Sequence, residues 1–403
     1  IAERIFRERG DQRYSLELMP AGITIEVDRL RREHREMVGE LTVSVNGSFP
    51  KARSVGGIIS IADFNFSSAM ARTTRAKLLA ERSQAGSLDW YGFLEEFSLK
   101  VMDAERKGQP AIVLADEPDT PEAADTWEVD GFPILRDLPM VLFGSGSSGK
   151  SYFAMWLAGR LAAQGIPVLY ADWEFSIRDH RRRFGRLFQP MPPCLFYVRC
   201  DRPIKDEIER LTRLVRLHAC QYIVCDSMVF ALEGAAEGSE QAGIYFRALR
   251  QLRIGSLNLA HIAKGDAEEE TPFGSVFFSN GARSVWYSHR AQQSPFGLLR
   301  MGLYHRKSNV GEILKPRGFQ FKFSGESTHV ERLDVESVDE LAAKMPLLAR
   351  AQRALQAGAM TPKALADDLG VQTPMILRLV SRHGSVFSHL GPKLGLASRE
   401  LDF

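Results

Sequence analysis

The stretch that decides the fold is Pro139-Met-Val-Leu-Phe-Gly-Ser-Gly-Ser-Ser-Gly-Lys-Ser151, an apolar run followed by a loop of glycine and serine. Residues 144–151 match the pattern G-x-x-x-x-G-K-[ST] in full, and residues 152–164 have helical spacing. A strand, a glycine-rich loop and a helix in this order are the context that the pattern requires. A chance match would need all three elements to fall in register by coincidence. We therefore expect a phosphate-binding loop here.

The residue types in this loop suit a bound triphosphate and its metal ion. Glycine lets the backbone curl so that several N–H groups point at one anion, and the start of the helix adds partial positive charge. Lys150 brings an ammonium to the β- and γ-phosphates, and Ser151 offers a hydroxyl to Mg²⁺. The predicted nucleotide-binding residues are Gly144, Ser145, Gly146, Ser147, Ser148, Gly149, Lys150, Ser151 and Tyr152.

An acid closes the apolar run Tyr222-Ile-Val-Cys-Asp226, which comes 76 residues after Lys150. A carboxylate at the end of a strand can hold the water shell of Mg²⁺, so Asp226 is the second predicted metal residue, beside Ser151. The alternative is an ordinary strand-end aspartate that caps a turn. The next residue is Ser227, whereas many AAA-type ATPases carry their water-activating glutamate there.

Glu174 is the predicted catalytic base. It follows the apolar run 168–172, and we expect that run to form a strand beside the loop-bearing strand, so that the carboxylate faces the γ-phosphate and orients the attacking water. The alternative is an acid that stabilises a helix N-terminus. Asp172, two residues earlier, is a further candidate for water or metal. His261, at the end of the run 257–262, is the predicted γ-phosphate sensor, although a lone histidine there is often an ordinary loop residue.

The pattern along the chain predicts an α/β fold with three domains. Residues 1–125 form an α+β accessory region with a hairpin at 14–27, a basic helix at 27–39, a long loop at 46–68 and helices at 70–82 and 90–107. Residues 126–335 alternate short strands and amphipathic helices, which is typical of a mostly parallel sheet covered on both faces. The expected strands are 139–143, 168–172, 195–198, 222–226 and 257–262, with an antiparallel edge pair at 298–304 and 319–323.

Residues 336–403 look like a winged helix-turn-helix domain. Thr361 and Thr373 are expected N-caps, Pro362 and Pro374 follow them, and residues 386–397 are the expected wing. The predicted DNA contacts are Gln372, Arg378, Arg382 and Lys393. Winged helices also dock proteins, so DNA binding is one of two interpretations.

Composition limits where nucleic acid can bind. The chain has 403 residues, with 52 basic and 50 acidic side chains and a net charge of +2, so any DNA surface is a local patch. The run 178–186 is the densest positive cluster and is either a solvated helix face or a contact with DNA or a neighbouring subunit. No apolar run approaches the roughly 20 residues that span a bilayer. We expect a cytoplasmic protein that does not enter the membrane.

The loop, Glu174, Asp226-Ser227 and His261 together resemble the RecA-type ATPases. The segments His261-Ile-Ala-Lys264, residues 272–286 and His305-Arg-Lys-Ser-Asn-Val-Gly311 sharpen the resemblance to the RepA-like branch of hexameric helicases of plasmids, phages and integrated elements. The resemblance covers about residues 126–330. It implies a homo-oligomer, most simply a hexameric ring, in which a basic residue of one subunit completes the active site of the next. Arg306 and Lys307 are the candidates for that catalytic role, with Arg283 as a weaker one, because the family's usual pattern there differs from residues 306–311.

This resemblance predicts an enzyme with ATP and Mg²⁺ as cofactors: a ring-forming ATPase that unwinds, loads onto or remodels DNA for a mobile genetic element. Residues 233–240 and 265–271, expected to line the pore of such a ring, are acidic and would repel phosphate. A non-motor DNA-binding protein whose assembly is controlled by nucleotide is therefore the alternative. A small-molecule kinase is a third interpretation, which the absence of an evident lid or acceptor pocket in the sequence disfavours.

Overall fold

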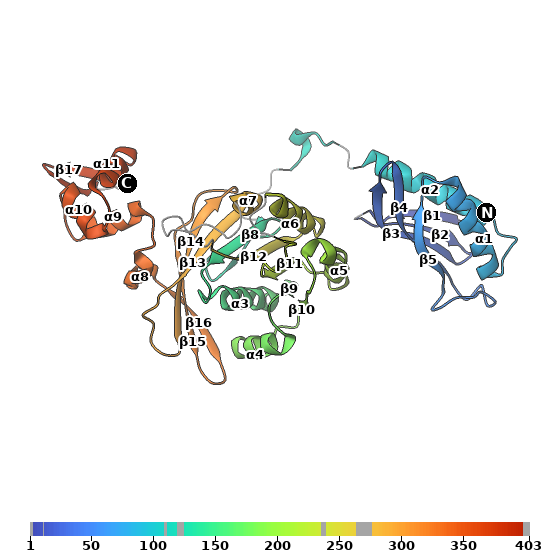
Figure 1. Ribbon diagram of the computed structural model, residues 1–403, viewed down its shortest axis with the longest axis horizontal. Coiled ribbons are helices and arrows are strands. Elements are labelled where there is room, and N and C mark those ends of the chain that lie inside the picture. The colour runs from blue at the N-terminus through green and yellow to red at the C-terminus, as the bar shows by residue number, and fades with distance from the viewer. Residues whose placement is uncertain are drawn as a thin grey trace. The chain divides into compact units, whose positions relative to one another are not determined.

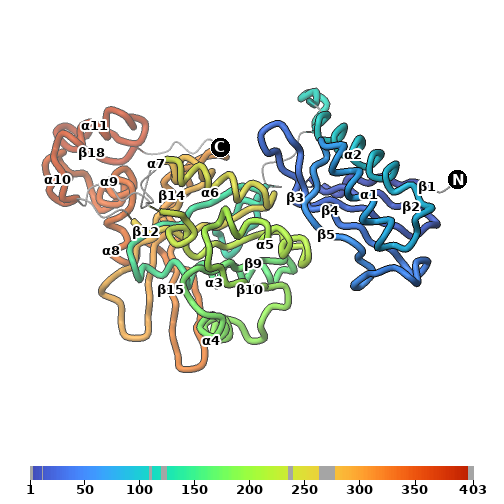
Figure 2. Tube along the Cα trace, turned by 45° about the vertical axis from the view of Figure 1, so that its right-hand side comes forward, coloured from blue at the N-terminus to red at the C-terminus, as the bar shows by residue number. Residues whose placement is uncertain are grey.

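The computed structural model describes residues 3–10, 12–108, 111–118, 125–234, 239–262 and 276–397. The chain divides into two compact units, Ile1–Asp119 and Thr120–Phe403. Each unit is described by itself (Figure 1 and Figure 2).

The first unit is an antiparallel sheet with two helices against one face. The strands follow one another in the order β1-β2-β3-β4-β5, and side chains of both helices, such as Leu79 and Phe97, pack into the core with Leu16 and Ile25 of the sheet. The elements are β1 (Glu3–Glu8), β2 (Tyr14–Met19), β3 (Ile23–Glu33), β4 (Glu36–Val45), β5 (Ile58–Asn65), α1 (Ala69–Ser83) and α2 (Trp90–Lys107), with a 3-10 turn at Leu114–Asp116.

Two expectations for this unit were wrong. Residues 27–39, predicted as a basic helix, are the end of β3 and the start of β4, because cross-strand ion pairs such as Arg29–Glu40 and Arg31–Asp63 hold the charged residues in the sheet. The predicted loop at 46–68 contains β5, whose Ile59 and Phe64 are buried. The hairpin and both helices are confirmed.

The second unit is built on a mixed sheet of order β10-β9-β11-β12-β8-β13-β14-β15-β16. The first six strands are parallel, and β14 to β16 extend the sheet antiparallel. The strands are β8 (Pro139–Gly144), β9 (Val168–Asp172), β10 (Leu195–Arg199), β11 (Tyr222–Asp226), β12 (Gly255–His261), β13 (Ser284–Arg290), β14 (Leu298–Ser308), β15 (Arg317–Phe323) and β16 (Thr328–Leu333), preceded by the hairpin of β6 (Thr126–Val129) and β7 (Phe132–Leu135).

Helices cover both faces of this sheet. The helices are α3 (Lys150–Ala163), α4 (Ile177–Leu187), α5 (Ile204–Leu217), α6 (Ser239–Gln251) and α7 (Val276–Gly281). Strand residues alternate between the faces: Met140 and Leu142 pack against α3 and α4, whereas Val141 and Phe143 pack against α5 to α7 (Figure 1). This arrangement is a three-layer α/β/α sandwich, so the α/β class predicted for this region and each of its predicted strands are confirmed.

The order of the strands corrects one expectation. The strand β9 does not lie beside β8, because β11 and β12 lie between them. The carboxyl ends of these parallel strands still meet at one edge of the sheet, which keeps Glu174 near the phosphate-binding loop. The pattern also missed β13, since Ser284, Ser288 and Arg290 interrupt its apolar residues.

The C-terminal residues form a small helical cluster with a hairpin. Its elements are α8 (Asp339–Ala342), α9 (Leu347–Gln356), α10 (Pro362–Leu369), α11 (Thr373–Arg382), β17 (Phe387–Leu390) and β18 (Lys393–Leu396), with a 3-10 turn at Val335–Ser337. Leu365, Ile376 and Val380 share a core with the hairpin. Thr361 caps α10 as expected, but Gln372 rather than Thr373 occupies the N-cap of α11. Within the described residues, no helix is both long and apolar enough to cross a bilayer.

Candidate nucleotide-binding site

The carboxyl edge of the parallel strands opens into a cavity of about 780 Å³. Residues 147–152 line it, and so do the predicted base Glu174, the predicted metal residue Asp226 and the predicted sensor His261. Four segments far apart in the sequence thus meet in one cavity. Gly144, Ser145 and Gly146 belong to the same loop but do not line this cavity.

The loop after β8 owes its path to two glycines. Gly149 has φ +93°, and a Cβ on Gly144 would lie 2.4 Å from the carbonyl oxygen of Ser288 on β13. Gly146 meets neither constraint, and Ser147 takes the left-handed conformation at φ +61° instead. The helix α3 begins at Lys150 without a side-chain cap, so its first N–H groups remain available to an anion.

Lys150 is held by its own loop. Its Nζ donates to the carbonyl oxygens of Gly144 at 3.0 Å and Ser145 at 2.8 Å. Burial lowers the pKa of this ammonium to about 8, against the opposing charges of Asp226 and Glu174. A phosphate would restore a counter-charge beside the ammonium, and the site is therefore electrostatically prepared for an anion.

Asp226 and Ser151 suit a magnesium ion. The Asp226 carboxylate is 2% exposed, and burial raises its pKa to about 6, although hydrogen bonds from Tyr170 (2.7 Å) and Ser151 oppose that shift. A buried carboxylate beside a hydroxyl is a set of oxygen ligands that Mg²⁺ accepts, and a cation would offset the cost of burying the charge. The peptide bond between Asp226 and Ser227 is cis.

Glu174 is anchored from two neighbouring strands. Ser227 Oγ donates to Glu174 Oε1 at 2.6 Å, and His261 Nε2 lies 3.9 Å from the same oxygen. His261 first and then Ser227 lower the pKa of Glu174, against partial burial, so the carboxylate is ionised near neutral pH. An ionised carboxylate in this position can accept a proton from a water molecule in the cavity.

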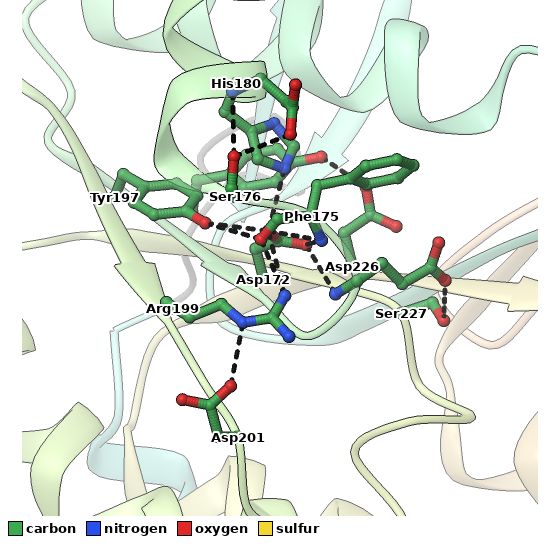
Figure 3. Close-up of polar contacts among 12 residues, drawn as sticks. Asp172, Phe175, Ser176, His180, Tyr197, Arg199, Asp201, Asp226 and Ser227 are labelled. Atoms are coloured by element: carbon green, nitrogen blue, oxygen red, sulfur yellow. Dashed lines mark hydrogen bonds and ion pairs between the residues drawn. The ribbon is translucent and has the colours of Figure 1, made fainter.

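Asp172, the further candidate for water or metal, does not line the cavity. It is fully buried and accepts hydrogen bonds from the backbone N–H groups of Glu174 (3.0 Å) and Phe175 and from the Tyr197 hydroxyl (2.9 Å), while His180 Nε2 lies 3.0 Å away. Figure 3 shows these groups converging on one carboxylate. Asp172 therefore fixes the turn that carries Glu174.

Sequence reasoning missed part of the cavity wall. Arg183 and Arg186 of α4 line the cavity, and the Arg183 guanidinium lies 4.4 Å from the centre of the Phe175 ring and 5.6 Å from that of Tyr152. Two residues of the positive run 178–186, Arg183 and Arg186, therefore line the cavity instead of lying on a face that contacts only solvent. The spacing of the arginines along the sequence indicates that they share one face of α4. The direction in which that face points depends on the position of β9, which the sequence does not give.

The predicted basic residues of β14 lie away from the cavity. The register of β13 with β8 and β14 places Arg306 and Lys307 beside residues 285–286, whereas Ser288 pairs with Gly144 at the edge that carries the loop. Lys307 Nζ donates to the carbonyl oxygens of Ser279, Asn280 and Ala282 at the end of α7. Arg306 is exposed and lies over the rings of Tyr287 and Tyr304.

The remaining predicted positions are on the surface or outside the described residues. Gln372, Arg378, Arg382 and Lys393 are exposed on α11 and the hairpin that follows it. Leu377, which directly precedes Arg378 on α11, is 53% exposed. Lys264 and the acidic segment 265–271 lie outside the residues that the structure describes, as do residues 235–238 of the other acidic segment.

Comparisons with known proteins give a similarity of fold. No protein-family model and no curated protein matches the chain. Among solved structures, a KaiC-like protein from the hyperthermophilic archaeon Pyrococcus horikoshii OT3 superposes on 49% of this chain and 91% of its own, with 16% identity and a TM-score of 0.40. A similarity of this size identifies no activity and no partner.

Proposed function

We propose that the chain is a Mg²⁺-dependent ATPase of the RecA type. The observation that carries this proposal is the cavity in which residues 147–152, Glu174, Asp226 and His261 meet. A phosphate-binding loop, a metal-holding acid and an ionised carboxylate are the parts that hydrolysis of a nucleoside triphosphate requires.

Each residue has one role in this proposal. Lys150 and the N–H groups of the loop hold the β- and γ-phosphates, and Ser151 and Asp226 hold Mg²⁺, which neutralises charge that develops on the phosphates. Glu174 orients a water molecule in line with the γ-phosphate and accepts its proton. His261, 3.9 Å from Glu174, reports whether the γ-phosphate is present. The water oxygen bonds to phosphorus as the bond to the β-phosphate oxygen breaks.

We further propose that the chain acts as a ring, most simply a hexamer, on DNA. Arg306 does not line the cavity of its own chain, and in this proposal it serves the site of a neighbouring copy. The exposed arginines of α11 favour DNA as the partner of the third domain, residues 336–403. The same arginines also suit the alternative, a non-motor protein that binds DNA and assembles under the control of nucleotide.

Two variants test the ATPase. Lys150→Ala removes the ammonium at the phosphates and is expected to abolish both ATP binding and hydrolysis. Glu174→Gln keeps the size of the side chain but cannot accept the proton, so ATP is expected to stay bound while turnover falls by about 10²-fold or more. Glu128→Gln, an exposed acid on β6, is the matched control. Normal turnover by Glu174→Gln would show that another residue is the base.

Imaging and strand displacement separate the motor from the alternative. Negative-stain images with a non-hydrolysable ATP analogue are expected to show closed rings. ATP-dependent strand displacement by the purified protein supports the motor, whereas saturable DNA binding without displacement supports the regulator.

A further inference from the structure

Part of the cavity wall is formed by a loop that no motif marks. Residues 291–297, between β13 and β14, place Pro295 and Phe296 on the rim of the cavity that holds the phosphate-binding loop. Phe296 is fully exposed, at 108% of its reference area. A large aromatic ring in water at the mouth of a ligand cavity is an unusual placement for a residue without a binding role.

This loop is held in a defined shape. Leu298 N donates to the Pro295 carbonyl oxygen at 3.0 Å, and Phe323 N donates to Gly297 O at 2.8 Å. The Phe323 ring packs 5.0 Å from the ring of Tyr152, which follows the phosphate-binding loop directly. Tyr152, Phe323 and Phe296 all line the cavity, and we call these three rings the aromatic shelf.

Glu340 of α8 anchors the start of the same loop. Its carboxylate accepts hydrogen bonds from the backbone N–H groups of Gln292 at 2.6 Å and Gln293 at 2.9 Å. Two N–H groups pointing at one carboxylate restrict the backbone at the start of this loop, three to four residues before Phe296. Since α8 begins the C-terminal region, the rim of the nucleotide cavity is tied to that region through Glu340.

Resting on the proposed ATPase function, we propose that Phe296 stacks on the nucleobase of the bound nucleotide and that Glu340 is the residue that positions this loop. The ligand class is a nucleoside triphosphate whose base lies against the aromatic shelf at the rim. Stacking accepts any base because every base has a π face, so discrimination between bases is not required of Phe296. The apolar ring then loses its contact with water only in the bound state.

Two probes separate the base from the phosphates: ADP, and inorganic tripolyphosphate, which lacks a base. Titration calorimetry of the full chain with Mg²⁺ is expected to show that Phe296→Ala weakens ADP binding by about fivefold or more. Tripolyphosphate binding is expected to stay unchanged. Phe296→Trp, which keeps an aromatic face, is expected to retain ADP affinity, and Tyr91→Ala, an exposed aromatic of α2, is the control.

Glu340 is tested in the same way. Glu340→Ala is expected to weaken ADP binding without changing tripolyphosphate binding, and Glu340→Gln, which keeps one carbonyl acceptor, is expected to recover part of the loss. Equal ADP affinity of Phe296→Ala and the wild type would overturn the stacking, and so would a change of oligomeric state without a change of ADP affinity. If the wild type binds neither probe, it is the ATPase function that fails.

Discussion

The hydroxyl of Ser227 donates a 2.6 Å hydrogen bond to Glu174 Oε1, across the neighbouring strands β11 and β9. Ser227 follows the candidate metal residue Asp226 directly, so one strand end supplies both the candidate magnesium ligand and the anchor of the candidate base. The serine at this position, in place of a glutamate, thus has a structural partner: the carboxylate follows the neighbouring strand β9, and the serine hydroxyl holds it.

Ser227→Ala is expected to lower turnover at saturating ATP by about tenfold while leaving ATP affinity unchanged, because the base loses its orientation but the phosphate contacts remain. The Ser227 bond also lowers the pKa of Glu174. Its removal is expected to raise that pKa, and the acid side of the pH–rate profile should shift to higher pH. Steady-state kinetics across pH measures both effects.

The matched control for this variant is Ser256→Ala. Ser256 is as buried as Ser227, but it lies at the amino end of β12, whereas the cavity residue His261 lies at the carboxyl end. Ser227→Thr, which retains a hydroxyl, is expected to keep the wild-type pH profile. A Ser227→Ala enzyme with an unchanged profile would contradict a role for this bond in holding the base.

Local patterns predicted the strands of the second unit and the glycine-rich loop after β8 because contiguous residues encode these features. The run 139–151 carries its own strand, glycine turn and helix start, and the motif residues from Ser147 onward line the cavity. The position of Asp226 beside this loop was also predictable, since Asp226 ends the run 222–226 and the carboxyl ends of parallel strands share one edge of the sheet.

The rest depends on contacts between distant residues. The strand order separates β9 from β8, and no feature of the run 168–172 encodes that separation. The Asp172 carboxylate contacts Tyr197 of β10 and His180 of α4. These residues are far apart in the sequence and meet only in the folded chain. The charged run 27–39 has residues typical of a helix, and only pairing with neighbouring strands makes it a sheet.

Asp226→Asn is expected to stabilise the protein in the absence of nucleotide and metal. Burial raises the pKa of Asp226 in the folded state to about 6, above its ordinary value of 3.8. A raised carboxyl pKa means that ionisation costs stability: the cost is absent below about pH 4, grows as pH rises to about 6 and is then complete, at roughly 3 kcal/mol for a shift of about two units. Asparagine removes this cost and can still accept the hydrogen bond from Tyr170.

Thermal unfolding at pH 7.5 and at pH 4.5 measures this effect. The variant should melt above the wild type at pH 7.5, and the difference should shrink at pH 4.5. The same variant should lose the stabilisation by Mg²⁺ that the wild type shows with ADP bound. An equal or lower melting temperature of Asp226→Asn at pH 7.5 would mean that the carboxylate is not penalised by its burial.

Arg306 and Lys307 are expected to behave differently. Lys307 donates to three carbonyl oxygens at the end of α7, so Lys307→Ala should lower the melting temperature. Arg306 is exposed, and Arg306→Ala should leave the melting temperature near that of the wild type while lowering ATPase activity by about 10³-fold, if it completes the site of a neighbouring copy.

Mixing two inactive variants tests that condition directly. Lys150→Ala retains Arg306, and Arg306→Ala retains Lys150, so a ring that contains both has some sites with both residues intact. Activity is therefore expected to reappear on mixing. Arg283→Ala mixed with Lys150→Ala serves as the comparison, because Arg283 is the weaker candidate. A mixture that stays inactive, although the two variants co-assemble, would exclude Arg306 from a role between subunits.

The exposed arginines on α11 are expected to make DNA affinity depend on salt concentration. If Arg378 and Arg382 contact phosphates, the double substitution by alanine should weaken binding to duplex DNA for every sequence tested and should reduce the slope of log affinity against log salt by about two. Lys363→Ala, an exposed lysine of neighbouring α10, is the control for net charge.

A slope that falls equally for Arg378→Ala and Lys363→Ala would mean that charge acts at long range and that α11 does not enter a groove. An unchanged slope for the double variant would favour a protein as the partner of α11, and the exposed Leu377, which directly precedes Arg378, would then be part of that contact.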